Sequence, residues 1–552
     1  MLEGCTPWPE EFARRYREKG YWDDITLWQM VERSIAQSPD KTAVVHGDSR
    51  TSYRELGDRV GRMAVALAGS GLRPRERVVL QLPNGLDILV TVLALLRIGV
   101  IPVMALPAHR HEEINHFVHH ADAVAYFAPD HLRDFDYRPM AADIARRSPT
   151  LRQTFILGEP WPGQKSLTGV PIPVDDIESR IGPLAPPPEE VALMLLSGGT
   201  TGIPKLIPRT HRDYVYNCRQ CGRIAEFGPD TVYLAVLPMA HNYTLGCPGV
   251  LGALAWGGTV VIAPDLQTDT VFGLIARERV TVISAAMPLA VNWLASDAPE
   301  RYDLSSLRVF MGGGAKFAPE LRARIEERLH CTYQESYGTG EGLINMTRLD
   351  APEHLRMTSS GRPVSPGDEI KVIDNEGHEV PDGTIGELAV RGPYTMRGYY
   401  RAPAATAAAF TPDDFYRMGD AVRKIGEDLF YESRLKDLIN RGGEKISSEE
   451  VENHLLAHPR IKSACVVAMP DPVYGERACA FVILHEGSRM GFAEMQTFLL
   501  SRRIAKFKLP ERLEIVESFP LSPAGKVLRR ELRRLIETKM SAEMNTKRAD
   551  AV

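Results

Sequence analysis

The first 150 residues alternate between two hydrophobic patterns. Residues 53–70 and 86–98 place apolar side chains at helical spacing, whereas residues 77–81 form a short apolar run of strand length. Helices that alternate with short buried strands are typical of an open, mainly parallel sheet covered by helices. We therefore predict an α/β fold for this part of the chain.

Short apolar runs continue through the middle of the chain and are separated by glycine or polar turns. They cover residues 191–196, 232–237, 259–262, 281–284 and 309–311. Turns after such strands are where α/β proteins place their ligands. Residues 369–391 instead alternate apolar and polar positions around Asp374-Asn375-Glu376-Gly377, which predicts a hairpin in a smaller β region.

The last part of the chain has the length of a separate small α/β domain. It shows helical spacing over residues 448–457 and 492–501, and strand-like runs over residues 464–468, 478–484 and 512–516. The polar tail after Ile536 is expected to fray. We predict a large N-terminal domain of helix-covered β-sheets with the small β region over residues 1–435, and a small, mobile C-terminal α/β lid domain over residues 436–552.

Composition limits the class of protein. Apolar residues make up 44% of the 552 residues and charged residues 25%, as in ordinary soluble proteins. The net charge of -5 gives no reason to expect nucleic acid or an anionic membrane as a partner. The most apolar stretch, residues 88–106, is interrupted by Arg97 and Gly99, which favours a buried helix and strand and not a membrane span.

The seven cysteines are scattered and odd in number, which argues for a reducing compartment and against a disulfide framework. Cys218 and Cys221 form a lone C-x-x-C pair without a second pair or a histidine cluster, so metal or redox chemistry is not predicted there. The first nine residues lack the basic and apolar regions of a signal peptide. We expect a cytoplasmic protein.

Candidate chemistry begins where the apolar run 191–196 ends. The run leads into Ser197-Gly198-Gly199-Thr200-Thr201-Gly202, and the turn closes on Lys205. Glycines let backbone N–H groups converge on an anion, hydroxyls add donors and the ammonium adds charge, so this loop suits a phosphate. It lacks the Gly-Lys-Ser/Thr succession of a P-loop. On composition alone, an ordinary flexible turn is an equally good interpretation.

Three further motifs carry polar side chains on glycine turns. Tyr337-Gly338-Thr339-Gly340-Glu341-Gly342 contains a carboxylate that can hold Mg²⁺ against a phosphate, because hard cations prefer oxygen ligands. Tyr416-Arg417-Met418-Gly419-Asp420 offers a carboxylate to ribose hydroxyls, and Ser522-Pro523-Ala524-Gly525-Lys526 offers a lysine. Taken singly, each motif is compatible with a solvated turn.

The order of these motifs resembles the adenylate-forming superfamily of acyl-CoA synthetases, luciferases and peptide-synthetase adenylation domains. The shared pattern is Ser-Gly-Gly-Thr-Thr-Gly-x-Pro-Lys, Tyr-Gly-x-x-Glu, Tyr-Arg-x-Gly-Asp, Arg-x-Lys-Asp-x-Ile and Pro-x-Gly-Lys. Within the superfamily the chain most resembles stand-alone aryl-acid–AMP ligases of siderophore biosynthesis. The matching stretches are Gly4-Cys5-Thr6-Pro7-Trp8-Pro9, Lys205-Leu206-Ile207-Pro208-Arg209-Thr210-His211, His241-Asn242-Tyr243, Gly313-Gly314-Ala315-Lys316-Phe317 and Asn440-Arg441-Gly442-Gly443-Glu444-Lys445. Such enzymes join 2,3-dihydroxybenzoate or salicylate to AMP and pass the aryl group to the phosphopantetheine thiol of an aryl carrier protein.

The resemblance implies ATP as substrate and Mg²⁺ as cofactor. It implies that the loop from Ser197 to Lys205 holds the β- and γ-phosphates and that Glu341 holds Mg²⁺. Asp420 and Arg434 would bind the ribose. The adenine slot would be formed by Gly314, Ala315, Ser336, Tyr337, Gly338 and Thr339.

By the same resemblance Lys526 is the main catalytic side chain. When the carboxylate attacks the α-phosphorus, negative charge builds on the equatorial oxygens, and a lysine beside them stabilises that charge. Lys436 would be the hinge of the small domain, whose rotation would bring Gly442 and Gly443 toward the thiol for the second step. A plain surface lysine at a domain junction is the alternative for Lys436.

The aryl-acid pocket is expected around His241, Asn242 and Tyr243, with walls from Cys247, Gly314, Gly340 and Ile344. The position of Cys247 is commonly serine in 2,3-dihydroxybenzoate enzymes and cysteine in similar salicylate enzymes. A thiol is a weak hydrogen-bonding group and would leave a 3-hydroxyl poorly satisfied. Salicylate is therefore favoured over 2,3-dihydroxybenzoate, with Cys247 as simple core filling the alternative.

Three positions depart from the family pattern. Gly340 replaces a small alanine and is expected to widen the acid pocket and admit a substituted ring, which counts against salicylate itself. Met418 and Ser433 have no predicted effect on the chemistry. Two other functions stay open, an aryl-CoA ligase that uses coenzyme A as acceptor and a silent homologue that only binds a carrier protein. Against the second stand the intact side chains of Lys205, Glu341, Asp420 and Lys526.

Overall fold

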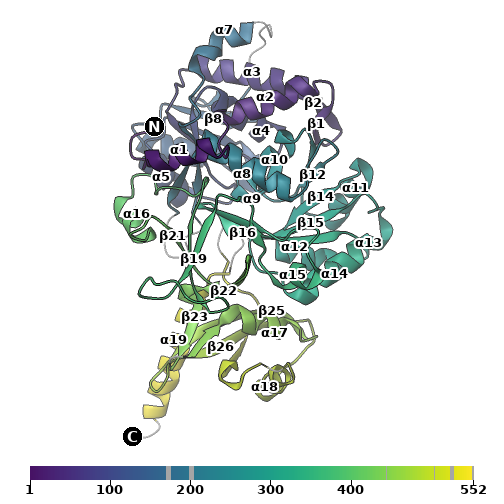
Figure 1. Ribbon diagram of the computed structural model, residues 1–552, viewed down its shortest axis with the longest axis vertical. Coiled ribbons are helices and arrows are strands. Elements are labelled where there is room, and N and C mark those ends of the chain that lie inside the picture. The colour runs from purple at the N-terminus through teal and green to yellow at the C-terminus, as the bar shows by residue number, and fades with distance from the viewer. Residues whose placement is uncertain (169–175, 198–203, 443, 503, 522–526, 550–552) are drawn as a thin grey trace. The chain divides into compact units, whose positions relative to one another are not determined.

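The computed structural model describes residues 1–168, 176–197, 204–442, 444–502, 504–521 and 527–549. The chain divides into a first unit, Met1–Ile370 with Val390–Tyr416, and a second unit, Lys371–Ala389 with Arg417–Val552. Helices and sheets occur in both (Figure 1), which confirms the predicted α/β class with a large N-terminal and a small C-terminal part. Lys436 lies inside the second unit, so the hinge at this residue stays a prediction.

A nine-stranded sheet occurs in the described part of the first unit, in the order β18-β17-β16-β15-β14-β12-β13-β1-β2. Its central pairings are parallel, and the pairings β1–β2, β16–β17 and β17–β18 at its ends are antiparallel. The strands are β1 (Thr42–His46), β2 (Ser49–Ser52), β12 (Val232–Ala235), β13 (Thr259–Ile262), β14 (Val282–Ala285), β15 (Val309–Gly313), β16 (Thr332–Thr339), β17 (Gly342–Met346) and β18 (Arg362–Pro363).

A second sheet of the first unit has the order β11-β10-β4-β3-β5-β8-β9 and is parallel except for the β10–β11 pair. Its strands are β3 (Arg77–Leu80), β4 (Ile101–Met104), β5 (Ala125–Pro129), β8 (Gln153–Leu157), β9 (Lys165–Ser166), β10 (Val191–Leu196) and β11 (Leu206–Thr210). A separate short pair is formed by β6 (His131–Leu132) and β7 (Phe135–Asp136).

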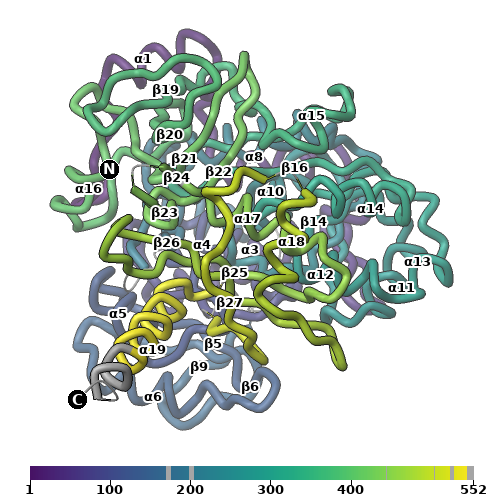
Figure 2. Tube along the Cα trace, turned by 90° about the horizontal axis from the view of Figure 1, so that it is seen from below, coloured from purple at the N-terminus to yellow at the C-terminus, as the bar shows by residue number. Residues whose placement is uncertain are grey.

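Helices cover both sheets; Figure 1 shows α11 to α14 gathered beside β14 and β15, and Figure 2 again shows these helices beside β14. There Phe272, Trp293 and Ile325 pack with Phe310 of β15 in one core, while Phe117 and helix α6 pack on the second sheet. The helices are α1 (Glu10–Glu18), α2 (Leu27–Gln37), α3 (Tyr53–Gly69), α4 (Leu86–Arg97), α5 (His111–His120), α6 (Arg138–Arg147), α7 (Ile177–Ile181), η2 (Gly182–Leu184), α8 (His211–Ile224), α9 (Asn242–Gly246), α10 (Gly249–Ala255), α11 (Thr268–Glu278), α12 (Met287–Ala295), α13 (Ala298–Arg301), α14 (Pro319–Leu329), α15 (Glu353–Thr358) and α16 (Pro403–Ala409).

The second unit holds most of a four-stranded sheet, β19-β20-β21-β22, and a five-stranded sheet, β24-β23-β26-β25 with β27 on β26. In its core Val451 and Met495 from two helices pack on Val466 and Val482 from two strands. The elements are β19 (Glu369–Ile373), β20 (Gly386–Arg391), β21 (Tyr416–Ile425), β22 (Asp428–Arg434), η3 (Leu435–Asp437), β23 (Leu438–Arg441), β24 (Glu444–Ser447), α17 (Ser448–Leu456), β25 (Ile461–Asp471), β26 (Gly475–Leu484), α18 (Phe492–Ser501), η4 (Lys506–Lys508), β27 (Arg512–Ile515) and α19 (Arg529–Ala549).

The predicted turn after β19 is confirmed, since Gly377 N donates to Asp374 O (3.2 Å). The predicted fraying after Ile536 is wrong, because α19 continues to Ala549. Ion pairs to β27 support the end of this helix, with Lys539 Nζ 2.6 Å from Glu514 Oε2.

Two findings bear on the environment of the protein. In the described part of the chain no helix combines the length and the apolar character that a membrane crossing needs. All seven cysteines, each of them described, are free thiols.

Candidate functional site

The predicted phosphate loop leaves β10 at Ser197 and returns to β11 at Lys205. Ser197 N donates to Lys205 O (2.9 Å), and Lys205 N donates to Ser197 Oγ (2.9 Å), so the two residues close the base of the loop. Ser197 is buried and Lys205 is exposed. The intervening predicted residues lie outside the described part of the chain: Gly198, Gly199, Thr200, Thr201 and Gly202.

Glu341 lies in the turn between β16 and β17 and is only 7% exposed. Its backbone O accepts a hydrogen bond from Met396 N (2.6 Å), and its Oε1 accepts one from the Tyr399 hydroxyl (3.0 Å). The centre of the Tyr399 ring is 4.8 Å from Lys205 Nζ. The predicted magnesium carboxylate and the predicted phosphate lysine therefore contact the same tyrosine.

The surroundings of Glu341 fit a magnesium ion that also binds a phosphate. Among the described residues no group of three or more His, Cys, Asp or Glu side chains is arranged to hold a metal ion. Mg²⁺ does not require such a group, because it commonly keeps several waters and uses one or two carboxylates together with substrate phosphates. Glu341 would contribute one such carboxylate, and the Tyr399 hydroxyl orients it through Oε1.

The residues predicted for the adenine slot lie at adjacent strand ends. Gly313, the last residue of β15, pairs with Ser336 of β16, so Gly314 and Ala315 leave the sheet beside Tyr337. Gly314 and Ala315 are exposed, and Gly314 has a φ of +82°, which favours glycine. Gly338 and Thr339 complete β16, and the Thr339 hydroxyl closes the following turn on Gly342 O (3.0 Å).

The predicted acid-binding residues gather around α9. His241 caps this helix through Nδ1, which accepts from Tyr243 N (3.2 Å). Asn242 Oδ1 accepts from the Tyr214 hydroxyl (2.7 Å), and its Nδ2 donates to Cys247 Sγ (3.4 Å). Asn242 and Cys247, two residues predicted to line the acid pocket, are therefore in contact.

The Tyr243 ring packs directly on the backbone of Gly313. A Cβ at Gly313 would lie 2.7 Å from Cζ of Tyr243, closer than two carbon atoms can approach. Glycine is required there by this contact, which places Tyr243, predicted to bind the acid, beside the start of the predicted adenine slot.

Cys247 is buried among hydrogen-bond donors. A hydrogen bond from the Cys221 thiol lowers the pKa of the Cys247 thiol. Hydrogen bonds from the side-chain amides of Asn217 and Asn242 also lower this pKa. Asn217 itself is held by Gly246 O, 2.6 Å from its Nδ2. The sulfur of Cys247 thus serves as an acceptor for protein groups.

The expected widening at Gly340 is not found. A Cβ at Gly340 would meet Cδ1 of Ile207 at 3.1 Å, so a side chain of β11 fills the space that the missing methyl leaves. Ile344, the other predicted wall, is 4% exposed in β17, and its N donates to the Tyr394 hydroxyl (2.9 Å).

The buried side chain of Arg209 connects three segments around the predicted acid pocket by hydrogen bonds. Thr210 begins α8 by a capping bond to Asp213, and Asp213 Oδ1 in turn accepts from Arg209 Nε (2.9 Å). The two remaining guanidinium nitrogens donate to Gly340 O (3.0 Å) and Tyr394 O (3.1 Å).

Five side chains of the site were not singled out from the sequence: Arg209, Tyr214, Asn217, Tyr394 and Tyr399. Two signals were available. Arg209 stands in a stretch shared with aryl-acid ligases, and Tyr394-Thr395-Met396-Arg397-Gly398-Tyr399-Tyr400 is unusually dense in aromatic residues.

The second unit holds the predicted ribose-binding pair. Asp420 of β21 lies opposite Arg434 of β22, and Arg434 Nε is 3.0 Å from Asp420 Oδ1. Arg434 also donates to the backbone O of Met418 (3.3 Å), one of the positions that depart from the family pattern. Ser433, the other such position in this sheet, is fully buried.

The predicted residues of the second step lie in the same unit. Lys436 is in η3, where its backbone O accepts from Arg533 Nη2 (2.8 Å). Gly442 follows β23 with a φ of +59°, and its N donates to Tyr474 O (2.8 Å). Gly443 and Lys526 lie outside the described residues.

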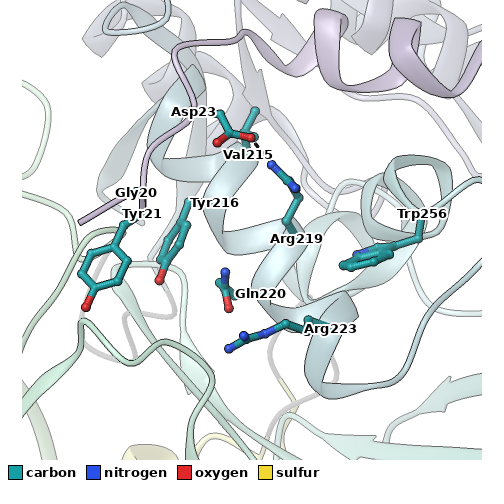
Figure 3. Close-up of a pocket in the computed structure, with 9 residues that line it drawn as sticks. All are labelled: Gly20, Tyr21, Asp23, Val215, Tyr216, Arg219, Gln220, Arg223 and Trp256. Carbon is teal, nitrogen blue, oxygen red and sulfur yellow. Dashed lines mark hydrogen bonds and ion pairs between the residues drawn. The ribbon is translucent and has the colours of Figure 1, made fainter. Parts of the chain in front are cut away.

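A pocket of about 140 Å³ in the first unit is separate from these groups (Figure 3). Tyr216, Arg219 and Arg223 of α8 line it, and Arg219 points to Asp23, with which it forms an ion pair. None of the predicted site residues lines this pocket.

Comparison with known proteins identifies the family. Residues 31–400 match the family described as AMP-binding enzyme, and residues 450–526 match the AMP-binding enzyme C-terminal domain. The chain is 44% identical to a 2,3-dihydroxybenzoate-AMP ligase of Bacillus subtilis (strain 168), over 98% of this chain and 99% of that protein. It is 42% identical to a salicylyl-CoA synthase / salicylate adenylyltransferase of a Streptomyces species, over 97% of this chain and 98% of that protein.

A solved structure agrees with this result. The apo structure of Mycobacterium smegmatis MbtA is similar with a TM-score of 0.73 and 39% identity, over 96% of this chain and 98% of that one. The chain therefore belongs to the AMP-binding enzyme family and is an adenylate-forming enzyme.

Proposed function

We propose that the protein is an aryl-acid–AMP ligase that activates salicylate, or a close analogue, with ATP to give aryl-AMP and pyrophosphate. It then transfers the aryl group to the phosphopantetheine thiol of an aryl carrier protein in siderophore or related nonribosomal peptide biosynthesis. Support comes from the Bacillus and Streptomyces relatives, whose names give hydroxylated benzoates as substrates.

The observation that carries the choice of acid is the environment of Cys247. Its sulfur accepts a hydrogen bond from Asn242 Nδ2, the residue is 1% exposed, and its backbone N donates to Tyr243 O (3.3 Å). A 3-hydroxyl placed here would exchange water for a weakly bonding thiol, which costs binding free energy. Salicylate has no such hydroxyl.

In the first step a carboxylate oxygen attacks the α-phosphorus, and pyrophosphate leaves with the electrons of the broken P–O bond. Lys205 and its loop would stabilise the leaving phosphates, and Asp420 would orient the ribose. Lys526, by resemblance, would neutralise charge on the equatorial oxygens. A Mg²⁺ ion held by Glu341 would supply further positive charge to the phosphates.

In the second step the carrier thiol attacks the aryl carbonyl and AMP leaves. The proposed rotation at Lys436 would replace Lys526 by the face that carries Gly442 and Gly443. The side chain of Lys436 is exposed, which fits the hinge and also the alternative of a plain surface lysine.

Two alternatives have a specific observation in their favour. The Bacillus relative is named for 2,3-dihydroxybenzoate, and the name of the Streptomyces relative gives coenzyme A as an acceptor. Both alternatives keep the same first step and differ in the ring or in the thiol.

The test is ATP–pyrophosphate exchange with salicylate, 2,3-dihydroxybenzoate and benzoate, followed by transfer to a phosphopantetheinylated aryl carrier domain or to coenzyme A. We expect the highest kcat/KM with salicylate and faster transfer to the carrier domain. Higher kcat/KM with 2,3-dihydroxybenzoate would contradict the assignment of the acid, and exchange with no benzoate would contradict the proposed function. A cytoplasmic location stays a prediction that cell fractionation tests.

A further inference from the structure

We propose that Tyr399 is a positioning residue that prepares both Lys205 and Glu341 for the magnesium–ATP complex. This inference rests on the proposed ATP site and assigns a role to a residue outside the motifs that define it. Tyr399 is 7% exposed and lies in the segment between β20 and α16.

The hydroxyl of Tyr399 fixes the carboxylate of Glu341. It donates to Oε1 (3.0 Å), while Met396 N holds the backbone O of the same residue (2.6 Å). A carboxylate held at its backbone and at one oxygen has a restricted orientation, so the direction of Oε2 is set before a cation arrives.

The Tyr399 hydroxyl is itself held in place. It lies 3.3 Å from the hydroxyl of Tyr416, another buried residue of the first unit. Tyr400 N, the next residue along the chain, donates to Leu206 O (3.0 Å), which fastens this segment to the strand that follows Lys205. The segment that carries Tyr399 is therefore held by two contacts, one to Tyr416 and one to Leu206 next to Lys205.

The ring of Tyr399 provides a place for the ammonium of Lys205. Nζ lies 4.8 Å from the ring centre, within the range of a cation–π contact. In the described part of the chain Lys205 makes no ion pair with an acidic side chain. An aromatic ring binds an ammonium more weakly than a carboxylate does. Phosphate oxygens can therefore bind the Lys205 ammonium without first breaking a salt bridge.

Together these contacts keep two opposite charges close to one tyrosine without pairing them to each other. A direct Lys205–Glu341 salt bridge would occupy the groups that the phosphates and the cation need. Tyr399 instead gives each charge its own partner, the ring for the ammonium and the hydroxyl for the carboxylate. This arrangement is electrostatic preorganisation of the kind that catalysis by charge stabilisation requires.

The test compares Tyr399→Phe, which removes the hydroxyl, with Tyr399→Leu, which removes the hydroxyl and the ring. Tyr400→Phe is the matched control, because the buried hydroxyl of Tyr400 has no hydrogen-bond partner among the described residues. Calorimetric titration measures the Kd of ATP with and without Mg²⁺, and the ratio of the two values gives the enhancement by the ion. Thermal unfolding and the KM of the acid are measured for every variant.

We expect Tyr399→Phe to reduce the Mg²⁺ enhancement of ATP binding about three- to tenfold, with little change in the Kd of ATP alone. Tyr399→Leu should show the same loss and also weaken binding of ATP alone about threefold, because Lys205 is no longer ordered. Tyr400→Phe should match the wild type in both values.

An unchanged enhancement in Tyr399→Phe would overturn the role of the hydroxyl, and tighter binding of ATP alone by Tyr399→Leu would overturn that of the ring. A uniform loss of stability, ATP binding and acid binding at a constant Mg²⁺ enhancement would also contradict the inference, since it indicates only a packing role. Failure of the wild type to bind ATP would instead contradict the proposed function.

Discussion

Among single residues, Cys247 has the largest expected effect on the choice of acid. Serine is smaller than cysteine, and its hydroxyl both donates and accepts hydrogen bonds. Cys247→Ser is expected to raise kcat/KM for 2,3-dihydroxybenzoate relative to salicylate about tenfold in ATP–pyrophosphate exchange, the value of one good bond to a buried group. Cys331→Ser, at a partly buried free thiol remote from α9 in sequence, is the control and should leave the ratio unchanged. An unchanged ratio in Cys247→Ser would show that this position does not select the ring.

Asp368 makes the stability of the protein depend on pH. Burial raises the pKa of Asp368 from 3.8 to about 8, although Tyr394 Oη donates to its Oδ2 (2.8 Å). Between these values the folded state holds a proton that the unfolded state releases, so stability falls as pH rises, by at most about 1.4 kcal/mol per pH unit. Asp368→Asn should therefore gain stability relative to the wild type between pH 5 and pH 8 in urea unfolding. An equal difference in the free energy of unfolding between Asp368→Asn and the wild type at pH 5 and at pH 8 would contradict the raised pKa of Asp368.

At the scale of elements, Ser197 and Lys205 close the β10–β11 hairpin at the base of the predicted phosphate loop. Ser197→Ala removes the acceptor for Lys205 N and leaves a backbone donor without this partner. We expect the KM of ATP in pyrophosphate exchange to rise about three- to tenfold, with the KM of the acid unchanged. Ser49→Ala, at an exposed residue of β2, is the control. An equal rise in both KM values would mean that the hairpin does not act on ATP alone.

The elements also show what the sequence can and cannot predict. The bounds of β10, β13 and α18 were predicted correctly, because apolar runs and flanking polar turns mark them locally. The extent of α19 was not predicted correctly. Glu543 of this helix pairs with Arg512 of β27, 31 residues earlier, and no local pattern in the sequence reveals such a contact.

The candidate site shows the same division between local motifs and long-range contacts. Asn242 and Cys247 were predicted from a motif, and the structure places them in contact. Tyr399 was not predicted, because its importance comes from Glu341, 58 residues earlier, and from Lys205. Sequence motifs mark the residues expected to contact ligands. The residues that position those motif residues are brought to them by long-range packing.

At the scale of the whole molecule, the account assigns the two half-reactions to different faces of the second unit. Lys526→Ala is expected to slow adenylate formation by about 100-fold or more, as for loss of a group that stabilises developing charge. Thioester formation from supplied aryl-AMP should be spared, because Lys526 is proposed to be withdrawn in that step. Rates of both steps, measured by quenched flow, test this, and equal losses would show that the lid assignment is wrong.

The central claim is that a carboxylate oxygen of the aromatic acid attacks the α-phosphorus of ATP. Salicylate labelled with ¹⁸O in both carboxylate oxygens, incubated with the enzyme, ATP and a carrier domain, tests it by mass spectrometry of the released AMP. The account predicts one ¹⁸O atom in AMP and none in pyrophosphate. Unlabelled AMP formed along with the aryl thioester would contradict it.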